Sequence, residues 1–215
     1  MNLLFLSNQN LSKVEQIDEA IISLFQNKKN KSIAYFPSQT DFPKQYLAYI
    51  EAYYKRLGIK IDVYFDTDKQ YNFNLLETAL KCDAIHLSGG YTFHFWQNIV
   101  QKNLIKPLTE FAKNDGIFIG VSAGAIMMTP KIDSSLLCGD PIIEGLSTKA
   151  LGFVNWEFVP HANSIQEMHE KLLKYSESTQ NKIFACSDGG GIMLNNNSLE
   201  LMGNISTFEN GILSK

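Results

Sequence analysis

Short apolar segments alternate with longer segments of helical periodicity along this chain, and this alternation restricts its fold more than any other feature. Within the first 121 residues, strands are predicted at 3–6, 32–36, 59–65, 84–87 and 117–121, and helices at 14–25, 43–57, 73–81, 107–113 and in a stretch running through Trp96. Ser12 and Glu15 form the pattern of a capping box at the first of these helices. Strands separated by helices indicate βαβ units, and therefore a parallel sheet with helices on both faces.

The last third of the sequence follows a different pattern. Segments 153–159 and 183–186 predict buried strands on either side of a helix at 165–175. Segments 191–194 and 199–202 flank the polar turn Asn195-Asn196-Asn197-Ser198, which is typical of an antiparallel hairpin, and a final strand is predicted at 205–208. The predicted fold is therefore a doubly wound α/β sheet, mostly parallel with an antiparallel C-terminal edge, in a single domain over residues 1–215.

Charge and cysteine content narrow the classes of function. The sequence has 19 Lys+Arg against 22 Asp+Glu and no basic run, which argues against a nucleic-acid partner. It contains no apolar stretch of the roughly 18 residues that a membrane span needs, and its start lacks the basic region of a signal peptide. Cys82, Cys138 and Cys186 lie far apart, and an odd, sparse set favours a reducing compartment. A soluble, cytoplasmic protein is predicted.

The most informative motif is the Gly-x-Ser-x-Gly pattern at 120–124, which directly follows one predicted strand and precedes an apolar helical segment. This is the context of a nucleophile elbow, in which a serine hydroxyl is raised at the carboxyl end of a sheet over the positive end of a helix. Because glycines carry no Cβ, they leave room for the strained turn. The pattern also fits a tight strand–helix turn with a capping serine. Ser122 is the candidate nucleophile.

A second glycine-rich turn, Ser88-Gly89-Gly90, follows the predicted strand at 84–87. Acyl transfer needs two N–H groups aimed at the developing oxyanion, one from the residue after the nucleophile and one from a neighbouring loop. Ala123 and Gly90 fit these two places, and a glycine allows the substrate to approach the backbone closely. An ordinary turn between a strand and a helix is the alternative explanation for the paired glycines.

Four histidines could supply a general base: His86, His94, His161 and His169. His86 lies within an apolar strand, where a core histidine is expected, and His94 and His169 lie on predicted helices. His161 follows the strand at 153–159, and the carboxyl ends of strands are where doubly wound sheets gather their active sites. His161 is therefore the candidate base. No two histidines have a convincing metal-ligand spacing, so no metal is predicted.

An acidic residue is needed to orient the imidazole, and the candidates are Asp133, Asp140, Glu144 and Asp188. Asp188 is preferred because it follows a predicted buried strand and precedes three glycines, which suggests a tightly packed loop. Asp140 is the second choice. A turn aspartate bonded to its own loop is the alternative explanation for Asp188.

Together these motifs resemble the peptidase E (aspartyl dipeptidase) family of serine peptidases, which also includes cyanophycinase. The resemblance rests on Gly120-Val-Ser122-Ala-Gly-Ala125, on the earlier Ser88-Gly-Gly-Tyr-Thr-Phe93, on Pro160-His161 and on the late acidic residue before glycine. The order and approximate spacing of these motifs match that family from about Leu3 to Met202.

The resemblance implies a flavodoxin-like sheet related to class I glutamine amidotransferases. It also implies Ser122 as nucleophile, His161 as base, Asp188 as the acid found in some members, and Gly90 and Ala123 at the oxyanion hole. Typical members cleave dipeptides with an N-terminal aspartate and use no cofactor. We therefore expect a small peptide as substrate and partner, no cofactor or metal, no nucleic-acid or membrane partner, and a monomer or homodimer.

Two departures from the family pattern affect specificity. Tyr91 stands where the family usually has Asn after the paired glycines. The family also carries arginines on the helix after the histidine, whereas the helix predicted at 165–175 has none and Arg56 is the chain's only arginine. A lysine is a point charge and not a bidentate fork, so it would recognise a carboxylate differently. Lysines that could do so are Lys131, Lys171 and Lys174. The accepted side chains and peptide length stay open.

Other functions fit the same sequence. The chain could hydrolyse another acyl bond, such as a cyanophycin-like β-aspartyl linkage or an ester, or it could be a non-catalytic flavodoxin-like binding module. Against the binding module, Ser7-Asn8-Gln9-Asn10 follows the first strand where a phosphate-binding loop would need glycines. The segment 133–150 is rich in Gly and Ser and is predicted to be a loop over the site.

Overall fold

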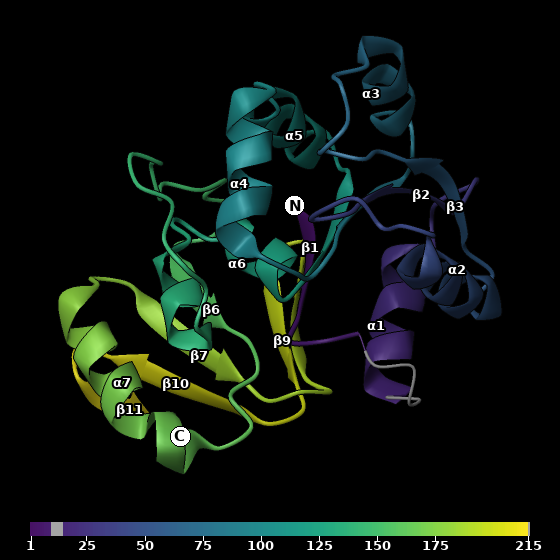
Figure 1. The fold of residues 1–215 in the computed structure, drawn as a ribbon. Helices are drawn as coiled ribbons and strands as arrows, with labels where there is room; N and C mark the ends of the chain where they lie inside the picture. The colour runs from purple at the N-terminus through teal and green to yellow at the C-terminus, as the bar shows by residue number, and fades with distance from the viewer. Residues whose placement is uncertain (10–14, 215) are drawn as a thin grey trace.

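A seven-stranded sheet forms the centre of the computed structural model, which describes residues 1–9 and 15–214 (Figure 1). Its strands run in the order β3-β2-β4-β5-β1-β8-β9. They are β1 (Asn2–Leu6), β2 (Ser32–Phe36), β3 (Lys60–Tyr64), β4 (Ala84–Leu87), β5 (Ile117–Val121), β8 (Gly191–Asn195) and β9 (Ser198–Met202). The first five strands are parallel, β8 runs antiparallel to β1, and β9 runs antiparallel to β8. The predicted mostly parallel sheet with an antiparallel C-terminal edge is confirmed.

Helices cover both faces of this sheet, because alternate strand residues point to opposite sides and both sets are apolar. Leu4 and Leu6 pack in one core layer with α1 (Glu15–Leu24) and α2 (Gln45–Arg56). Leu3 and Phe5 pack in the other layer with four further helices: α3 (Phe73–Ala79), α4 (Thr92–Gln101), α5 (Ile105–Lys113) and α6 (Ala123–Met127). Ser12, the predicted cap of the first helix, lies outside the described residues.

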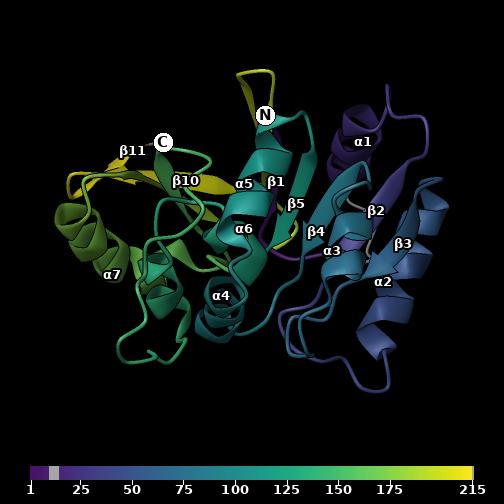
Figure 2. The same cartoon turned by 90° about the horizontal axis from the view of Figure 1, so that it is seen from above.

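A second sheet, which the sequence did not indicate, lies beside the first on the β1 side, opposite β3 (Figure 2). Its order is β11-β10-β7-β6, with β6 (Trp156–Val159), β7 (Lys182–Cys186), β10 (Ile205–Glu209) and β11 (Ile212–Ser214), and α7 (Ile165–Ser178) packs against it. Strands at 153–159 and 183–186 were predicted, but apolar pattern alone does not say which sheet a strand joins. The two sheets meet through aromatic rings: Phe5 lies 4.6 Å from Trp156 and 6.0 Å from Phe158 between ring centroids.

The segment 133–150, predicted as a loop over the site, begins with a 3-10 helix, η1 (Asp133–Cys138). Three hydrogen bonds then fasten it to the start of α4. Tyr91 Oη donates to Pro141 O at 2.7 Å, Trp96 Nε1 donates to Ser147 O at 2.9 Å, and Thr92 N donates to Asp140 Oδ2 at 3.0 Å. Tyr91, one of the two departures from the family pattern, therefore holds this segment in place. None of the helices in the described part of the chain combines the length and apolarity needed to cross a membrane.

Candidate active site

Ser122 occupies a strained turn between β5 and α6, with φ 48° and ψ −109°. Its backbone N–H donates to Leu6 O at 2.9 Å, which ties the turn to β1. The flanking glycines are needed for close packing. A Cβ on Gly124 would lie 2.1 Å from Leu87 O, and one on Gly120 would lie 2.7 Å from the Ala125 backbone N. The predicted strand–turn–helix context is therefore present, and its tightness explains why both positions are glycine.

The structure brings Ser122, His161 and Asp188 together in a hydrogen-bonded series. Ser122 Oγ lies 2.9 Å from His161 Nε2, and His161 Nδ1 lies 2.7 Å from Asp188 Oδ1. Ser122 follows β5 of the large sheet, whereas His161 and Asp188 follow β6 and β7 of the second sheet. The side chains of His161 and Asp188 are 42% and 34% exposed, so the series is open to a molecule arriving from solvent.

Besides the contact with the imidazole, three hydrogen bonds with two side chains hold Asp188 in place. Asn163 Nδ2 donates to its Oδ2 at 2.8 Å, Asn163 Oδ1 accepts the Asp188 N–H at 2.7 Å, and Ser7 Oγ donates to its Oδ1 at 3.0 Å. Partial burial raises the pKa of Asp188, but the hydrogen bonds from Asn163, His161 and Ser7 outweigh it and leave the pKa below its ordinary value. The carboxylate is therefore ionised at neutral pH and faces the imidazole as an anion.

Ser7, which directly follows β1, is hydrogen-bonded to both His161 and Asp188, the two residues that follow strands of the second sheet. Its hydroxyl oxygen accepts the His161 N–H at 2.8 Å, and its proton is directed to Asp188 Oδ1 at 3.0 Å or Cys186 O at 3.1 Å. His161 has a left-handed backbone with φ 59°, which is uncommon for a non-glycine residue and is held here by that N–H bond. Sequence reasoning missed Ser7 and Asn163. Their only signal was a polar side chain shortly after a predicted strand at the same sheet edge.

Gly90 lies in the loop after β4, and Ala123 directly follows Ser122 as the first residue of α6. A Cβ on Gly89 would lie 3.4 Å from Ser122 Cβ, and Gly124 N donates to Ser88 O at 3.1 Å, so the loop after β4 is bonded to the elbow. Gly90 has φ +135°, a conformation that favours glycine. Among the described residues, no acceptor is bonded to the N–H of Gly90 or of Ala123. Both donors are thus available to a ligand oxygen.

The other candidate residues from the sequence lie elsewhere. His86 is buried on β4, its Nδ1 lies 2.7 Å from Tyr54 Oη, and burial lowers its pKa to about 3, as expected of a core histidine. His94 Nε2 lies 2.6 Å from Asp68 Oδ1. Asp140, the second choice for the acid, accepts the Thr92 N–H at the start of α4.

Metal ligands and lysines for a substrate carboxylate are the remaining groups that the sequence raised. The described residues contain no group of three His, Cys, Asp or Glu side chains arranged to hold a metal ion. Lys131 Nζ lies 3.7 Å from Glu157 Oε1 and 3.8 Å from Asp133 Oδ2, so it is already engaged by carboxylates. Lys171 and Lys174 are exposed on α7.

Comparison with known proteins supplies the family. The family model of Peptidase family S51 matches residues 3–202. The chain is 25% identical to Peptidase E of Escherichia coli over 175 residues, which cover 79% of this chain and 73% of that protein. It is 24% identical over 212 residues to the uncharacterized peptidase PM1590 of Pasteurella multocida, covering 95% of this chain and 99% of the relative.

Two solved structures share the fold. A proposed peptidase E from Listeria monocytogenes superposes with a TM-score of 0.73 at 20% identity, covering 94% of this chain and 98% of that one. A peptidase from an acI-B1 Actinobacterium superposes with a TM-score of 0.68 at 15% identity, covering 97% of this chain and 91% of its own. At these identities the likeness concerns the fold alone.

Proposed function

Because the chain belongs to peptidase family S51 and is a serine peptidase, we propose that it hydrolyses short peptides through an acyl-enzyme intermediate formed on Ser122. The observation that carries this proposal is the hydrogen-bonded series from Ser122 Oγ through the His161 imidazole to the Asp188 carboxylate, at 2.9 and 2.7 Å. These distances lie within the range expected for a nucleophile, a base and an orienting acid.

In the first half of the proposed reaction, His161 Nε2 accepts the Ser122 proton as Oγ attacks the scissile carbonyl. Asp188 accepts a hydrogen bond from Nδ1–H, which selects the tautomer with a free Nε2 and stabilises the imidazolium that forms. The N–H groups of Gly90 and Ala123 bind the oxyanion, and each such donor contributes about 3 kcal/mol in comparable sites. His161 then gives its proton to the leaving amine.

In the second half, His161 removes a proton from a water molecule that attacks the ester carbonyl, and it returns this proton to Ser122 Oγ as the bond between Oγ and the carbonyl carbon breaks. This half uses the same donors in the same places, because a second tetrahedral oxyanion forms at the same carbon. The exposure of the imidazole, 42% of its side-chain surface, supports water access from outside. No further group is needed for the proton balance.

We propose no strict requirement for an aspartate at the scissile bond. The cations on the helix that follows His161 are Lys171 and Lys174, both exposed, and the sequence has no arginine there. A lysine cannot form the bidentate pair that fixes a carboxylate in one orientation. Short peptides with several kinds of residue at this position are therefore the expected substrates.

A broad dipeptide mixture, analysed by mass spectrometry and free-amine release, tests the proposal with wild type and Ser122→Ala side by side. We expect particular dipeptides to disappear only with wild type, with the variant at least about a thousandfold slower. The variant should fold normally, because it loses one oxygen atom. Equal turnover by both proteins would exclude Ser122 as nucleophile, and no turnover by either would exclude dipeptides as substrates.

A further inference from the structure

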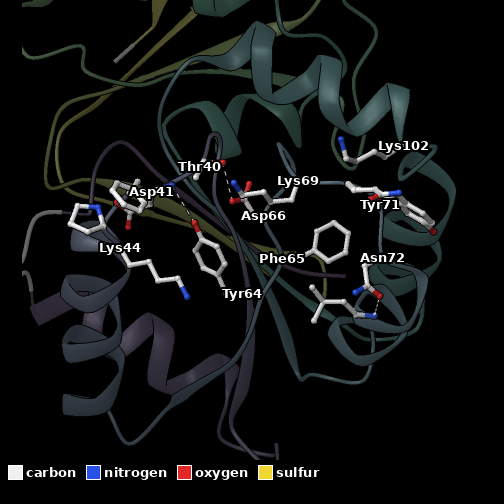
Figure 3. Close-up of a pocket in the computed structure, with 14 residues that line it drawn as sticks. Thr40, Asp41, Lys44, Tyr64, Phe65, Asp66, Lys69, Tyr71, Asn72 and Lys102 are labelled. Atoms are coloured by element: carbon white, nitrogen blue, oxygen red, sulfur yellow. Dashed lines mark hydrogen bonds between the residues drawn. The ribbon is translucent and has the colours of Figure 1, made fainter.

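A hollow lies between the segments that follow β2 and β3, at the edge of the large sheet that also carries Ser122 (Figure 3). Its volume of about 550 Å³ falls within the roughly 300–1,000 Å³ usual for small-ligand sites. In the strand order it is separated from β5, which carries Ser122, by β4 and β2. At about 4.8 Å per strand, β2 and β3, which lead into the hollow, lie roughly 10–14 Å from β5 across the sheet.

A continuous backbone segment leads from the elbow to this hollow. Ser38 N donates to Ser88 Oγ at 2.8 Å, and Ser38 Oγ lies so close to Gly90 that a Cβ there would be 2.1 Å away. Thr40, two residues after Ser38, already lines the hollow. The segment from Ser38 to Thr40 therefore connects the loop that holds Gly90 with the lining of the hollow.

The carboxylates that line the hollow are committed to hydrogen bonds within the protein. Asp66 accepts from Thr40 Oγ1 and from Asp68 N, both at 3.0 Å, through different oxygens. Asp41 Oδ2 accepts the Leu47 N–H at 2.8 Å in the first turn of α2. These bonds hold the two loops in shape and occupy oxygens of both carboxylates, which keep their negative charge.

The cations that line the hollow are not committed in this way. Lys44, Lys69 and Lys102 come from the two loops and from the end of α4, and Figure 3 shows Lys44 and Lys102 on opposite sides with Tyr64 and Phe65 between them. Within the described part of the chain, no carboxylate oxygen lies within 4.0 Å of any of these three Nζ atoms. Three lysines against two aspartates leave the lining with a net charge of +1, and the three ammonium groups have no carboxylate partner among the described residues.

Lys44 is positioned with some strain. Its backbone is left-handed, with φ 68° and ψ 36°, and its N–H donates to Asp41 O at 2.8 Å. Its Nζ lies 5.1 Å from the centroid of the Tyr64 ring, over the ring face. An aromatic face beneath an ammonium allows a ligand to combine an apolar contact with an ionic one.

We infer that this hollow binds an acidic residue of an extended peptide substrate, about three to four residues from the scissile bond. The inference rests on the proposed function and adds a substrate class to it. The distance follows from the span of roughly 10–14 Å and the rise of about 3.3 Å per extended residue. The lysines attract the carboxylate, and Tyr64 and Phe65 contact its aliphatic part.

The test starts from a bond that the dipeptide mixture shows to be cleaved. Peptides are made that extend this dipeptide by three residues at one end or the other, with Glu or Gln as the terminal added residue. We expect kcat/KM to favour Glu over Gln by about tenfold at low salt for one of the two extensions, and the preference to shrink as salt rises. No preference at either end would overturn the inference.

Variants of the three lysines that line the hollow test whether the preference for Glu over Gln arises there. The triple variant Lys44→Gln, Lys69→Gln, Lys102→Gln should reduce the ratio of Glu to Gln to about one. A matched variant with Lys29→Gln, Lys55→Gln and Lys113→Gln changes net charge equally at exposed sites elsewhere and should keep the ratio. Equal loss in both variants would attribute the effect to overall charge and overturn the inference.

Binding separates this inference from the proposed function. Affinity is measured by fluorescence anisotropy with the Ser122→Ala protein, which needs no turnover, on Glu- and Gln-terminated pentapeptides of one fixed sequence chosen independently of the dipeptide results. Tighter binding of the Glu peptide, without hydrolysis by wild type, would support the hollow and overturn the proposed function. Equal kcat/KM and equal affinity for the Glu and Gln peptides would support the proposed function and overturn the inference that the hollow binds an acidic residue.

Discussion

Ser7 lies outside the hydrogen-bonded series, yet its hydroxyl bonds two of the three residues in it. The side chain is completely buried at the end of β1, so it has no access to substrate. Its oxygen accepts the His161 N–H, and its proton is shared between Asp188 and Cys186. Replacing Ser7 with Ala removes both bonds and leaves the reacting atoms in place. Ser7 is therefore a positioning residue whose removal should lower catalysis indirectly.

The size of the effect follows from the bonds lost. A bond to a charged carboxylate contributes about 1.5–3 kcal/mol and a neutral one about 1 kcal/mol, so Ser7→Ala should cost about 2–4 kcal/mol of unfolding free energy. If the bond to Asp188 matters fully in the transition state, its loss lowers kcat by about 10- to 100-fold. KM should change less than about twofold, because a buried hydroxyl does not contact substrate.

Ser134 offers a matched control, because it is also a fully buried serine, and its Oγ donates one hydrogen bond, to Phe158 O at 3.0 Å. Ser134→Ala should lose about 1 kcal/mol of stability and keep kcat within about twofold. Steady-state kinetics on one cleaved dipeptide and urea unfolding of both variants provide the comparison. Ser7→Thr keeps the hydroxyl and should recover much of kcat. Wild-type kcat in Ser7→Ala, or an equal loss in Ser134→Ala, would refute the positioning role.

Two further predictions concern charge. Asp188→Asn should lower kcat by about three to four orders of magnitude, because the amide would favour the wrong imidazole tautomer. Asp140→Asn should leave kcat nearly unchanged, because an amide oxygen can still accept the Thr92 N–H. A larger loss of kcat in Asp140→Asn than in Asp188→Asn would show that Asp140 is the acid. Burial lowers the pKa of His86 in the folded protein to about 3, against an ordinary value of 6.5. As pH falls through 6.5, the imidazole therefore binds a proton in the unfolded chain but not in the folded one, and the free energy of unfolding decreases. Urea unfolding should show a loss of about 2 kcal/mol between pH 7 and 5, and His86→Gln should lack that component; an equal loss in the variant would contradict the assignment.

The parts of the fold that depend on local pattern were predictable from the sequence. The strands predicted at 32–36, 84–87 and 117–121 have those bounds in the structure, because buried parallel strands are continuous apolar runs between polar turns. The hairpin at the C-terminal edge also follows from its turn residues. The strand–turn–helix around Gly-x-Ser-x-Gly was recognisable because strand, turn and helix each have their own signal over a few residues.

The second sheet was not predictable in the same way. Strand pairing joins residues far apart in the sequence, and an apolar run at 183–186 can pair with any exposed strand edge. In the structure β7 lies between β6 and β10, and the short β11 that extends this sheet was not predicted at all. The sequence favoured Asp188 over Asp140 because Asp188 follows a predicted buried strand, and the structure places Asp188 within hydrogen-bond distance of His161. Asp140 stayed a second choice because only tertiary packing shows which of the two carboxylates lies beside the imidazole.

Strand β1 and the residue that follows it fix the position of Ser122 relative to His161 and Asp188. Leu6 O accepts the Ser122 N–H at 2.9 Å, and the next residue, Ser7, bonds His161 and Asp188. One residue earlier, Phe5 packs on Trp156 of the second sheet. Because these three successive residues contact both sheets, a shift of one sheet against the other would strain bonds on both sides of Ser7. The distance between Ser122 and His161 is thus set by a strand that contributes no reacting atom.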